Sequence, residues 1–283
     1  MQIVDRKTKK ESTINYPKSV NFLYNCFFGR IILKLLIHRF TANLVAKYMS
    51  SSMSKKRIIK TIVDNNIDMS LFEDKEFSSY NDFFLRRKKN LDFDMNDKHF
   101  VSPADSKLMV YKLNKDTSFD IKGSYYTMND IVDEGILSGY ENGYALIFRL
   151  EVSDYHHYHF IDDGTIGKKG FIKGCLHTVL PVALKRYRVF HTNSREYTIL
   201  HTKNFDDVVQ VEVGALNVGK IVNEKVKKFK RGEEKGHFEF GGSTIILFVK
   251  NNVITIDNDI LLYSTLGKET KVSCGEKIGI KVD

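Results

Sequence analysis

The sequence predicts an α+β protein, with N-terminal amphipathic helices followed by a largely antiparallel β core of barrel-like or sandwich-like form. Two observations favour this fold class. Apolar residues recur at helical spacing before residue 90, whereas many short apolar runs with period two follow residue 100. Turn-forming residues separate those runs, as is typical of antiparallel sheets. We therefore expect a basic helical segment at 1–90 and a β-rich domain at 91–283.

Composition indicates a globular chain in a reducing compartment. The 283 residues are 42% hydrophobic and 28% charged, which is enough apolar material for a sizeable core. Cys26, Cys175 and Cys274 show no CxxC spacing, which excludes a disulfide scaffold and a cysteine zinc site. The first residues hold no apolar stretch, so we expect no cleavable signal peptide.

The N-terminal segment has the pattern of a helix that lies on a membrane. The chain has a net charge of +9, and residues 1–60 supply all of it, with 13 Lys and Arg against two acidic residues. Residues 21–40 are too short and too charged to span a bilayer. Wound as one helix, they place Cys26, Arg30, Lys34 and His38 on one stripe among Phe, Leu and Ile, which favours an interfacial helix. The alternative is that this face packs on the protein's own β domain. No nucleic-acid reading motif is present, so we expect no nucleic-acid partner.

Further helices and strands follow in order. We expect a helix after Ser54, which would be its N-cap, another over 79–89, and a short one near 127–135. The expected strands are 144–152, 155–161, 170–174, 195–202, 207–213, 220–226, 243–249, 253–257 and 277–282.

Histidines gather in the segment "DYHHYHFIDDG" (154–164). On a regular strand, His157 and His159 face one side and His156 the other. Such a cluster could supply a catalytic base, because imidazole exchanges protons near neutral pH, or it could be a solvated aromatic strand. An HxH pair could also ligate a metal, but no third ligand has suitable spacing, so we expect no metal site.

A glycine pair interrupts the apolar segment "HFEFGGSTIILF" (237–248) directly before Ser243. Two glycines inside a strand-like run predict a bulge or a tight bend. Asp105, which lies two residues after Pro103 and could equally be a simple turn former, completes a set of carboxylate, imidazole and hydroxyl. A serine embedded in a strand is badly placed to attack an outside ester. It is well placed to attack the carbonyl of Gly242, immediately before it.

Several ordered strings resemble the phosphatidylserine decarboxylase family, the bacterial, pyruvoyl-dependent type. The strings are "SSYNDFFLRR" (78–87), "VSPADSKL" (101–108), "DYHHYH" (154–159) and "FEFGGSTIILF" (238–248), with "HTVLPVAL" (177–184), "NSREYTIL" (193–200) and "VEVGALNVGKI" (211–221) similar to the family's barrel strands. The resemblance covers roughly residues 20–280. One departure is "KKNLDFD" (88–94), where the family often carries Arg-Pro.

The resemblance implies self-cleavage between Gly242 and Ser243. In that scheme His159, oriented by Asp105, deprotonates the Ser243 hydroxyl, which attacks the Gly242 carbonyl. The resulting ester eliminates, and Ser243 becomes an N-terminal pyruvoyl group, the cofactor. That ketone forms a Schiff base with the substrate amine and accepts electrons as carbon dioxide leaves. His156 would handle protons during decarboxylation.

The resemblance also implies partners and a location. A large β chain (1–242) and a small α chain (243–283) of one precursor would stay associated. His177 is a candidate pocket residue, with a simple strand-end residue as the alternative. The substrate would be phosphatidylserine and the product phosphatidylethanolamine. The protein would bind peripherally to the anionic surface of the cell membrane, on its cytoplasmic side. Two alternatives remain open: a pyruvoyl-dependent decarboxylase of another amino compound, and a non-enzymatic membrane-binding β domain.

Overall fold

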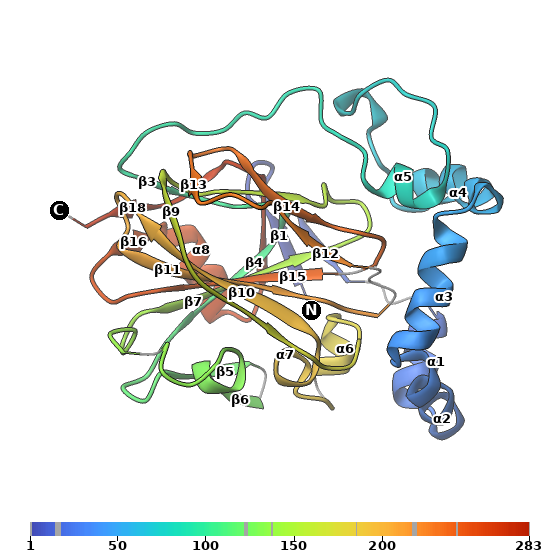
Figure 1. Cartoon of the computed structure of the whole chain (residues 1–283), viewed down its shortest axis with the longest axis horizontal. Coiled ribbons are helices and arrows are strands. Elements are labelled where there is room, and N and C mark those ends of the chain that lie inside the picture. The colour runs from blue at the N-terminus through green and yellow to red at the C-terminus, as the bar shows by residue number, and fades with distance from the viewer. Residues whose placement is uncertain are drawn as a thin grey trace.

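The protein is a mixed α+β structure in which the N-terminal helices stand to one side of a β-rich body built on a large sheet (Figure 1). The computed structural model describes residues 2–14, 18–121, 124–136, 138–184, 186–216, 220–241 and 243–282. Gly242, the expected cleavage residue, lies outside the described residues.

Helices come early in the chain and strands dominate after residue 98. The helices are α1 (Lys18–Asn25), α2 (Phe27–Leu36), α3 (Arg39–Met49), η1 (Ser52–Arg57), α4 (Ile58–Asp64), η2 (Met69–Leu71), α5 (Tyr80–Phe84), η3 (Met128–Asp130), α6 (Pro181–Leu184), α7 (Val189–Thr192) and α8 (Asn258–Thr265). The strands are β1 (Gln2–Asp5), β2 (Glu11–Thr13), β3 (His99–Val101), β4 (Ser106–Lys112), β5 (Ser118–Ile121), β6 (Ser124–Thr127), β7 (Tyr144–Leu150), β8 (His157–His159), β9 (Gly164–Ile172), β10 (Arg195–Thr202), β11 (Asp207–Val213), β12 (Ile221–Asn223), β13 (Lys228–Phe229), β14 (Glu234–Phe238), β15 (Ser243–Val249), β16 (Ile254–Ile256), β17 (Glu269–Val272) and β18 (Lys277–Lys281).

One ten-stranded sheet forms the body of the molecule, in the order β13-β9-β10-β11-β15-β7-β4-β17-β1-β2. All of its strand pairs are antiparallel except β1 with β17, which are parallel. In the described part of the chain, β13 and β2 end the sheet without pairing to each other. The expectation of a mainly antiparallel β core is confirmed, but the sheet is not closed into a barrel.

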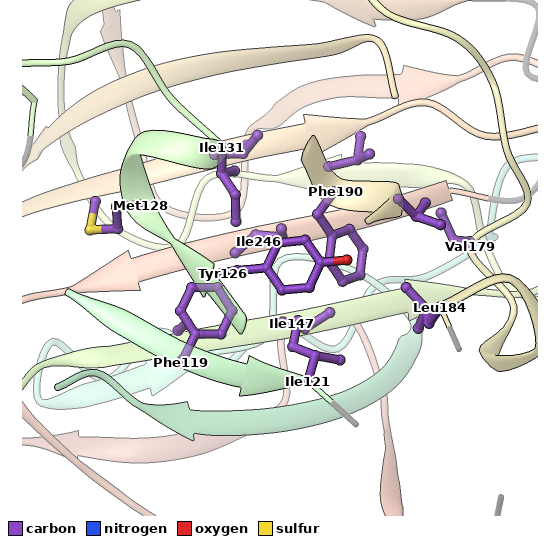
Figure 2. Packing of buried hydrophobic residues seen from close by; sticks show 14 of the residues in the cluster. Phe119, Ile121, Tyr126, Met128, Ile131, Ile147, Val179, Leu184, Phe190 and Ile246 are labelled. Atoms are coloured by element: carbon purple, nitrogen blue, oxygen red, sulfur yellow. The ribbon is translucent and has the colours of Figure 1, made fainter. Parts of the chain in front are cut away.

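Strand β15 lies at the centre of this sheet and is buried on both faces. Ile246 and Phe248 join one apolar cluster, which β5, β6, α6 and α7 cover (Figure 2). Ile245 and Leu247 join a second cluster on the other face, which includes residues of α8 and of two small sheets. A strand that is covered on both faces needs apolar residues at every position, which explains the unbroken run "IILFV".

The N-terminal helices differ from the single helix expected at 21–40. The chain leaves helical geometry at Cys26 and again at His38, both of which have extended backbone angles and precede α2 and α3. The prediction that Cys26, Arg30, Lys34 and His38 form one continuous polar stripe is therefore wrong. Leu33 is buried in the core of the β-rich part, as is Tyr24 of α1. One side of the helices thus packs on the protein, as the alternative expectation held, while many apolar side chains remain exposed.

Other local expectations are corrected. Ser54 is not an N-cap: it is buried inside η1, and Ser51 precedes that helix. The helix expected over 79–89 ends at Phe84, after Ser79 caps its start. The string "HTVLPVAL" is not a strand but leads into the short helix α6, because Pro181 suits a first helical turn.

Among the helices of the described ranges, none is long and apolar enough to cross a bilayer. The chain's first residues instead extend the large sheet, where β1 pairs with β17. Arg6, just after β1, forms ion pairs with Asp257 at 2.5 Å, Asp259 at 2.9 Å and Glu276 at 3.2 Å. Strand pairing and ion pairs therefore join residues 3–6 to residues 257–276.

Candidate active site

The segment "HFEFGGSTIILF" is not one strand but two, in different sheets. Strand β14 pairs with β8 and β12 in a small sheet and ends at Phe238, whereas β15 begins at Ser243 in the large sheet. Gly241 lies in the bend between them with φ of +139°, a backbone conformation that residues with a Cβ rarely adopt. Gly241 therefore lies at the point where the chain passes from the small sheet to the large one.

Ser243 is the first residue of β15 and is fully buried. Its backbone pairs with Leu150 of β7, which fixes its position in the ladder. Its hydroxyl oxygen Oγ has no hydrogen-bond partner among the described residues. A buried hydroxyl without a partner is unfavourable by about 1–3 kcal/mol, so such a group calls for an explanation, and a catalytic role is one.

The turn that carries Asp105 lies directly against His159. The backbone N–H of His159 donates to the carbonyl of Pro103 at 2.9 Å. The Asp105 carboxylate, however, pairs with the Lys88 ammonium at 2.6 Å and accepts a hydrogen bond from the backbone N–H of Cys274 at 2.8 Å. The fold thus brings the two predicted residues to neighbouring positions, while the side chain of Asp105 binds other partners.

His159 has the tautomer of a base. Its Nδ1 contacts the carbonyl oxygen of Gly232 at 2.9 Å, and because a carbonyl can only accept, Nδ1 must carry the hydrogen. The Nε2 lone pair is then free, and this buried atom has no partner within the described ranges. Burial lowers the pKa of His159, which keeps the ring neutral.

His156 shows the same tautomer for the same reason. Its Nδ1 donates to the carbonyl of Asp154 at 2.9 Å, and its buried Nε2 has no partner in the described part of the chain. Arg86 holds this turn from the other side by donating to the carbonyls of Ser153 and Asp154. Burial, with a smaller effect of the Arg86 charge, places the pKa of His156 well below its usual range.

Helix α5 connects His156 with the bend before Ser243. The Phe84 ring packs against the His156 ring at a centroid distance of 3.8 Å and against Phe240 at 5.5 Å. The side chain of Asn81 accepts a hydrogen bond from the backbone N–H of Phe240 at 2.9 Å, and Tyr80 meets the Phe240 ring at 5.1 Å. The "YNDFF" string thus positions both the histidine and the bend.

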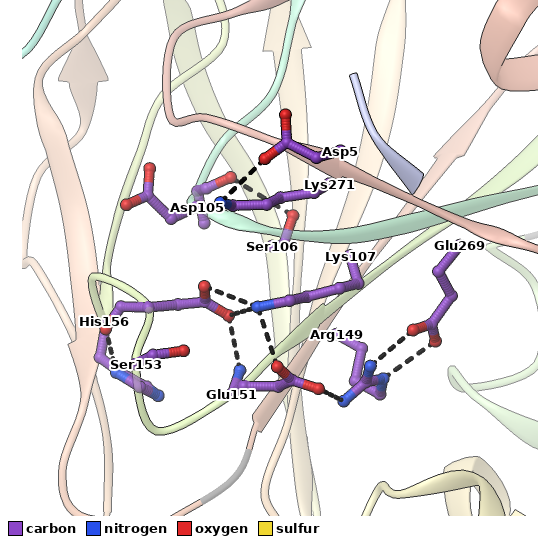
Figure 3. A network of polar contacts seen from close by, with 12 residues as sticks. Asp5, Asp105, Ser106, Lys107, Arg149, Glu151, Ser153, His156, Glu269 and Lys271 are labelled. Carbon is purple, nitrogen blue, oxygen red and sulfur yellow. Dashed lines mark hydrogen bonds and ion pairs between the residues drawn. The ribbon is translucent and has the colours of Figure 1, made fainter. Parts of the chain in front are cut away.

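A buried chain of ion pairs supports the turn that leads into His156 (Figure 3). Lys107 binds both oxygens of Asp154 at 2.7 and 2.8 Å and also pairs with Glu151 at 3.1 Å. Arg149 extends the chain from Glu151 to Glu269. Burial alone would lower the pKa of Lys107, but the two carboxylates outweigh burial and raise it. Removing one member would leave a buried charge unpaired.

His177 lies where α1 meets the β-rich part. Its Nδ1 is 3.3 Å from the Tyr24 hydroxyl, which also accepts a hydrogen bond from the backbone N–H of Thr178 at 2.9 Å. The ring stacks on Tyr187 at 4.3 Å, and burial lowers its pKa to about 4. His177 therefore helps to fasten the first helix to the rest of the protein.

The predicted residues thus come together only in part. Asp105 and His159 are neighbours, yet no hydrogen bond joins Asp105 to His159, or His159 to Ser243, among the residues that the structure describes. Sequence reasoning missed Lys88, the actual partner of Asp105, and Arg86, which holds the His156 turn. Arg86 follows the "NDFFL" string directly and Lys88 comes two residues later, and this position was the one available signal.

Comparisons with known proteins agree on one family. The sequence model described as Phosphatidylserine decarboxylase matches residues 80–280. A protein named phosphatidylserine decarboxylase proenzyme 2 from Clostridium acetobutylicum is 49% identical over 264 residues, which cover 92% of this chain and 91% of that protein. Proteins named phosphatidylserine decarboxylase proenzyme are 41% identical in Clostridium botulinum strain Hall, covering 93% of both chains, and 39% identical in Clostridium tetani, covering 99% and 98%.

Proposed function

The chain belongs to the phosphatidylserine decarboxylase family, and on this basis we propose that it converts phosphatidylserine to phosphatidylethanolamine with a pyruvoyl group formed from its own Ser243. One observation carries the proposal: a buried Ser243 hydroxyl that has no hydrogen-bond partner among the described residues and that follows the bend at Gly241 between two sheets. The Nε2 atoms of His156 and His159, which have no partner in the described part of the chain, also suit a site that handles protons. These residues therefore fit the pyruvoyl group.

Self-cleavage requires a base for the Ser243 hydroxyl and a flexible backbone before it. His159 supplies the base through its free Nε2 lone pair, and its lowered pKa keeps that lone pair available near neutral pH. Asp105 acts from the adjoining turn, where its carboxylate pairs with the Lys88 ammonium. The bend at Gly241 lets the peptide approach the hydroxyl, because glycine tolerates the required backbone angles.

Turnover would depend on His156 and on the exclusion of water. When present, the pyruvoyl carbonyl supplies an electron sink for the carbon–carbon bond that releases carbon dioxide. His156 would move the proton that the product requires, from a position fixed by Asp154 and Phe84. The complete burial of Ser243 and His156 keeps bulk water away from the reacting atoms.

The two chains left by cleavage would remain one molecule. Residues 243–283 contribute two interior strands of the large sheet: β15 pairs with β11 and β7, and β17 pairs with β4 and β1. Arg6 of the large chain also binds Asp257 and Asp259 of the small one. Separation would break these ladders and expose both apolar clusters, so the association persists without a peptide bond.

Membrane contact is proposed for the helical part of residues 1–90. Phe27, Phe28, Leu35 and Phe40 are between 64% and 74% exposed on α2 and α3. Such a concentration of exposed apolar side chains marks a binding surface rather than an ordinary protein surface. The basic residues of this segment suit anionic headgroups, which is consistent with peripheral attachment at the cytoplasmic side of the cell membrane.

A decarboxylation assay tests the proposed function. Wild-type protein is mixed with detergent-dispersed phosphatidylserine labelled at the serine carboxyl group, and released carbon dioxide is counted. We expect release from wild type and none from Ser243→Ala. Carbon dioxide release from free serine, but not from phosphatidylserine, would favour the alternative of a decarboxylase for a soluble amino compound. No carbon dioxide release from either substrate would support a non-enzymatic domain.

A further inference from the structure

Three metal-ligating side chains meet on strands β8 and β14, next to the proposed active site. His157 and His237 face each other as a register pair in the ladder, and Glu234 lies three residues before His237. One ligand atom from each of the three lies within 4.8 Å of the others. The sequence alone did not show this group, because almost 80 residues separate His157 from Glu234.

The hydrogen bonds of His157 leave its Nδ1 directed at a carboxylate. Its Nε2 lies 3.1 Å from the carbonyl oxygen of Leu85, which can only accept, so Nε2 carries a hydrogen. Its Nδ1 lies 2.7 Å from Glu234 Oε1. Two lone pairs at that distance would repel, so a cation, either a proton or a metal ion, must lie between them. An imidazole that donates its other N–H to a backbone carbonyl is also the usual arrangement of a metal-bound histidine.

His237 and Arg87 complete the geometry. His237 Nδ1 is buried, makes no hydrogen bond within the described part of the chain, and lies 3.5 Å from the same Glu234 Oε1. Arg87 binds the other carboxylate oxygen, Oε2, at 2.8 Å. Glu234 Oε1 is therefore directed at both imidazoles, while Oε2 is occupied by the ion pair with Arg87. This arrangement suits a carboxylate that binds a metal through one oxygen.

We propose that His157, Glu234 and His237 form a binding site for a zinc-type divalent cation. Two imidazole nitrogens and one carboxylate oxygen are a ligand set that zinc accepts, and they leave a fourth position for water. Magnesium and calcium prefer sites made of oxygen atoms only, so they would bind poorly here. The side chains of Glu234 and His237 are 17% and 20% exposed, which gives the ion a path from solvent. The site does not use Ser243, His156 or His159, so it stands apart from the proposed function.

Zinc titration of the full chain tests the proposal. The Ser243→Ala protein, kept as one chain, competes with a chromogenic zinc chelator in a buffer that contains excess magnesium. We expect one zinc ion per chain. His237→Ala and Glu234→Gln should each weaken zinc affinity at least tenfold. His201→Ala is the matched control, because His201 Nδ1 pairs with Asp207 at 2.6 Å and the two belong to no three-ligand group in the described ranges.

Cobalt(II) provides a second, spectroscopic readout, which reports the coordination geometry of the bound ion rather than its affinity. Cobalt bound in place of zinc by His157, Glu234 and His237 should give visible absorption bands of a four-coordinate ion, and His237→Ala should abolish them. Circular dichroism confirms that each variant is folded before it is compared. The proposal is overturned if the parent protein binds no zinc, or if His237→Ala and His201→Ala retain the same zinc affinity as the parent.

Discussion

Replacing Phe28 and Phe40 by Ser should release the protein from phosphatidylserine vesicles. Both rings project from the N-terminal helices, and they are 70% and 74% exposed. A phenylalanine side chain that is mostly exposed can bury about 140 Å² on insertion, which is worth about 3.5 kcal/mol at 25 cal/mol per Å². Two rings that are only half inserted would together contribute about 3.5 kcal/mol, so vesicle affinity should fall by about 100-fold or more.

Co-sedimentation with vesicles at two salt concentrations measures this effect. The basic residues add an attraction that salt screens, whereas the contribution of the rings persists at high salt. The matched control is Leu262→Ser with Leu266→Ser, which removes two side chains of similar exposure, 57% and 59%, at α8 in the β-rich part of the molecule. Self-cleavage should persist in both double variants. Full vesicle binding by the Phe28/Phe40 variant would refute the proposed membrane surface.

Three further predictions concern the site and the stability of the fold. His159→Ala and Asp105→Asn should slow self-cleavage about 100-fold or more on a denaturing gel, whereas His156→Ala should cleave normally and decarboxylate poorly; the reverse pattern would exchange the two histidine roles. Arg6→Ala should lower the urea concentration at which the small chain separates from the large one in gel filtration, because it removes ion pairs that join the large chain to Asp257 and Asp259 of the small one; an unchanged midpoint would contradict this. Because burial lowers the pKa of His177 from 6.5 to about 4, the unfolded chain binds more protons in that window, so the unfolding free energy should fall by at most about 3 kcal/mol as pH drops from 6.5 to 4. His177→Gln should flatten the pH dependence of the unfolding free energy between pH 6.5 and 4, as measured by urea titrations. An equally steep dependence in this variant would show that His177 is not its source.

Local patterns predicted the central strands well. The runs 195–202, 207–213 and 243–249 are strands with the expected bounds, because each is a β-branched or aromatic run next to turn residues. The motif order also placed Asp105, the histidines and Ser243 in one enzyme family before any geometry was known. Strand bounds and short motifs depend on residues that are neighbours along the chain, so a single sequence is enough to predict them.

Features that depend on distant partners could not be predicted. The short strand β1 exists because β17, more than 260 residues later, offers it an edge. Leu33 reads as part of an exposed apolar face, but the breaks at Cys26 and His38 turn it into the core. Similarly, Lys88 binds Asp105, and Glu234 and His237 join His157, only after the sheets assemble. Spacing along the chain carries no signal for such contacts.

The mass of the denatured protein tests the central claim most directly. Wild type should yield two pieces, residues 1–242 and residues 243–283, and the smaller piece should lack a free amino terminus and be lighter by one ammonia than a peptide that begins with serine. Ser243→Ala should remain one chain of 283 residues, because it lacks the hydroxyl that we propose as the nucleophile. An uncut wild-type chain, or efficient cleavage of Ser243→Ala, would contradict autocatalytic formation of a pyruvoyl group at this position.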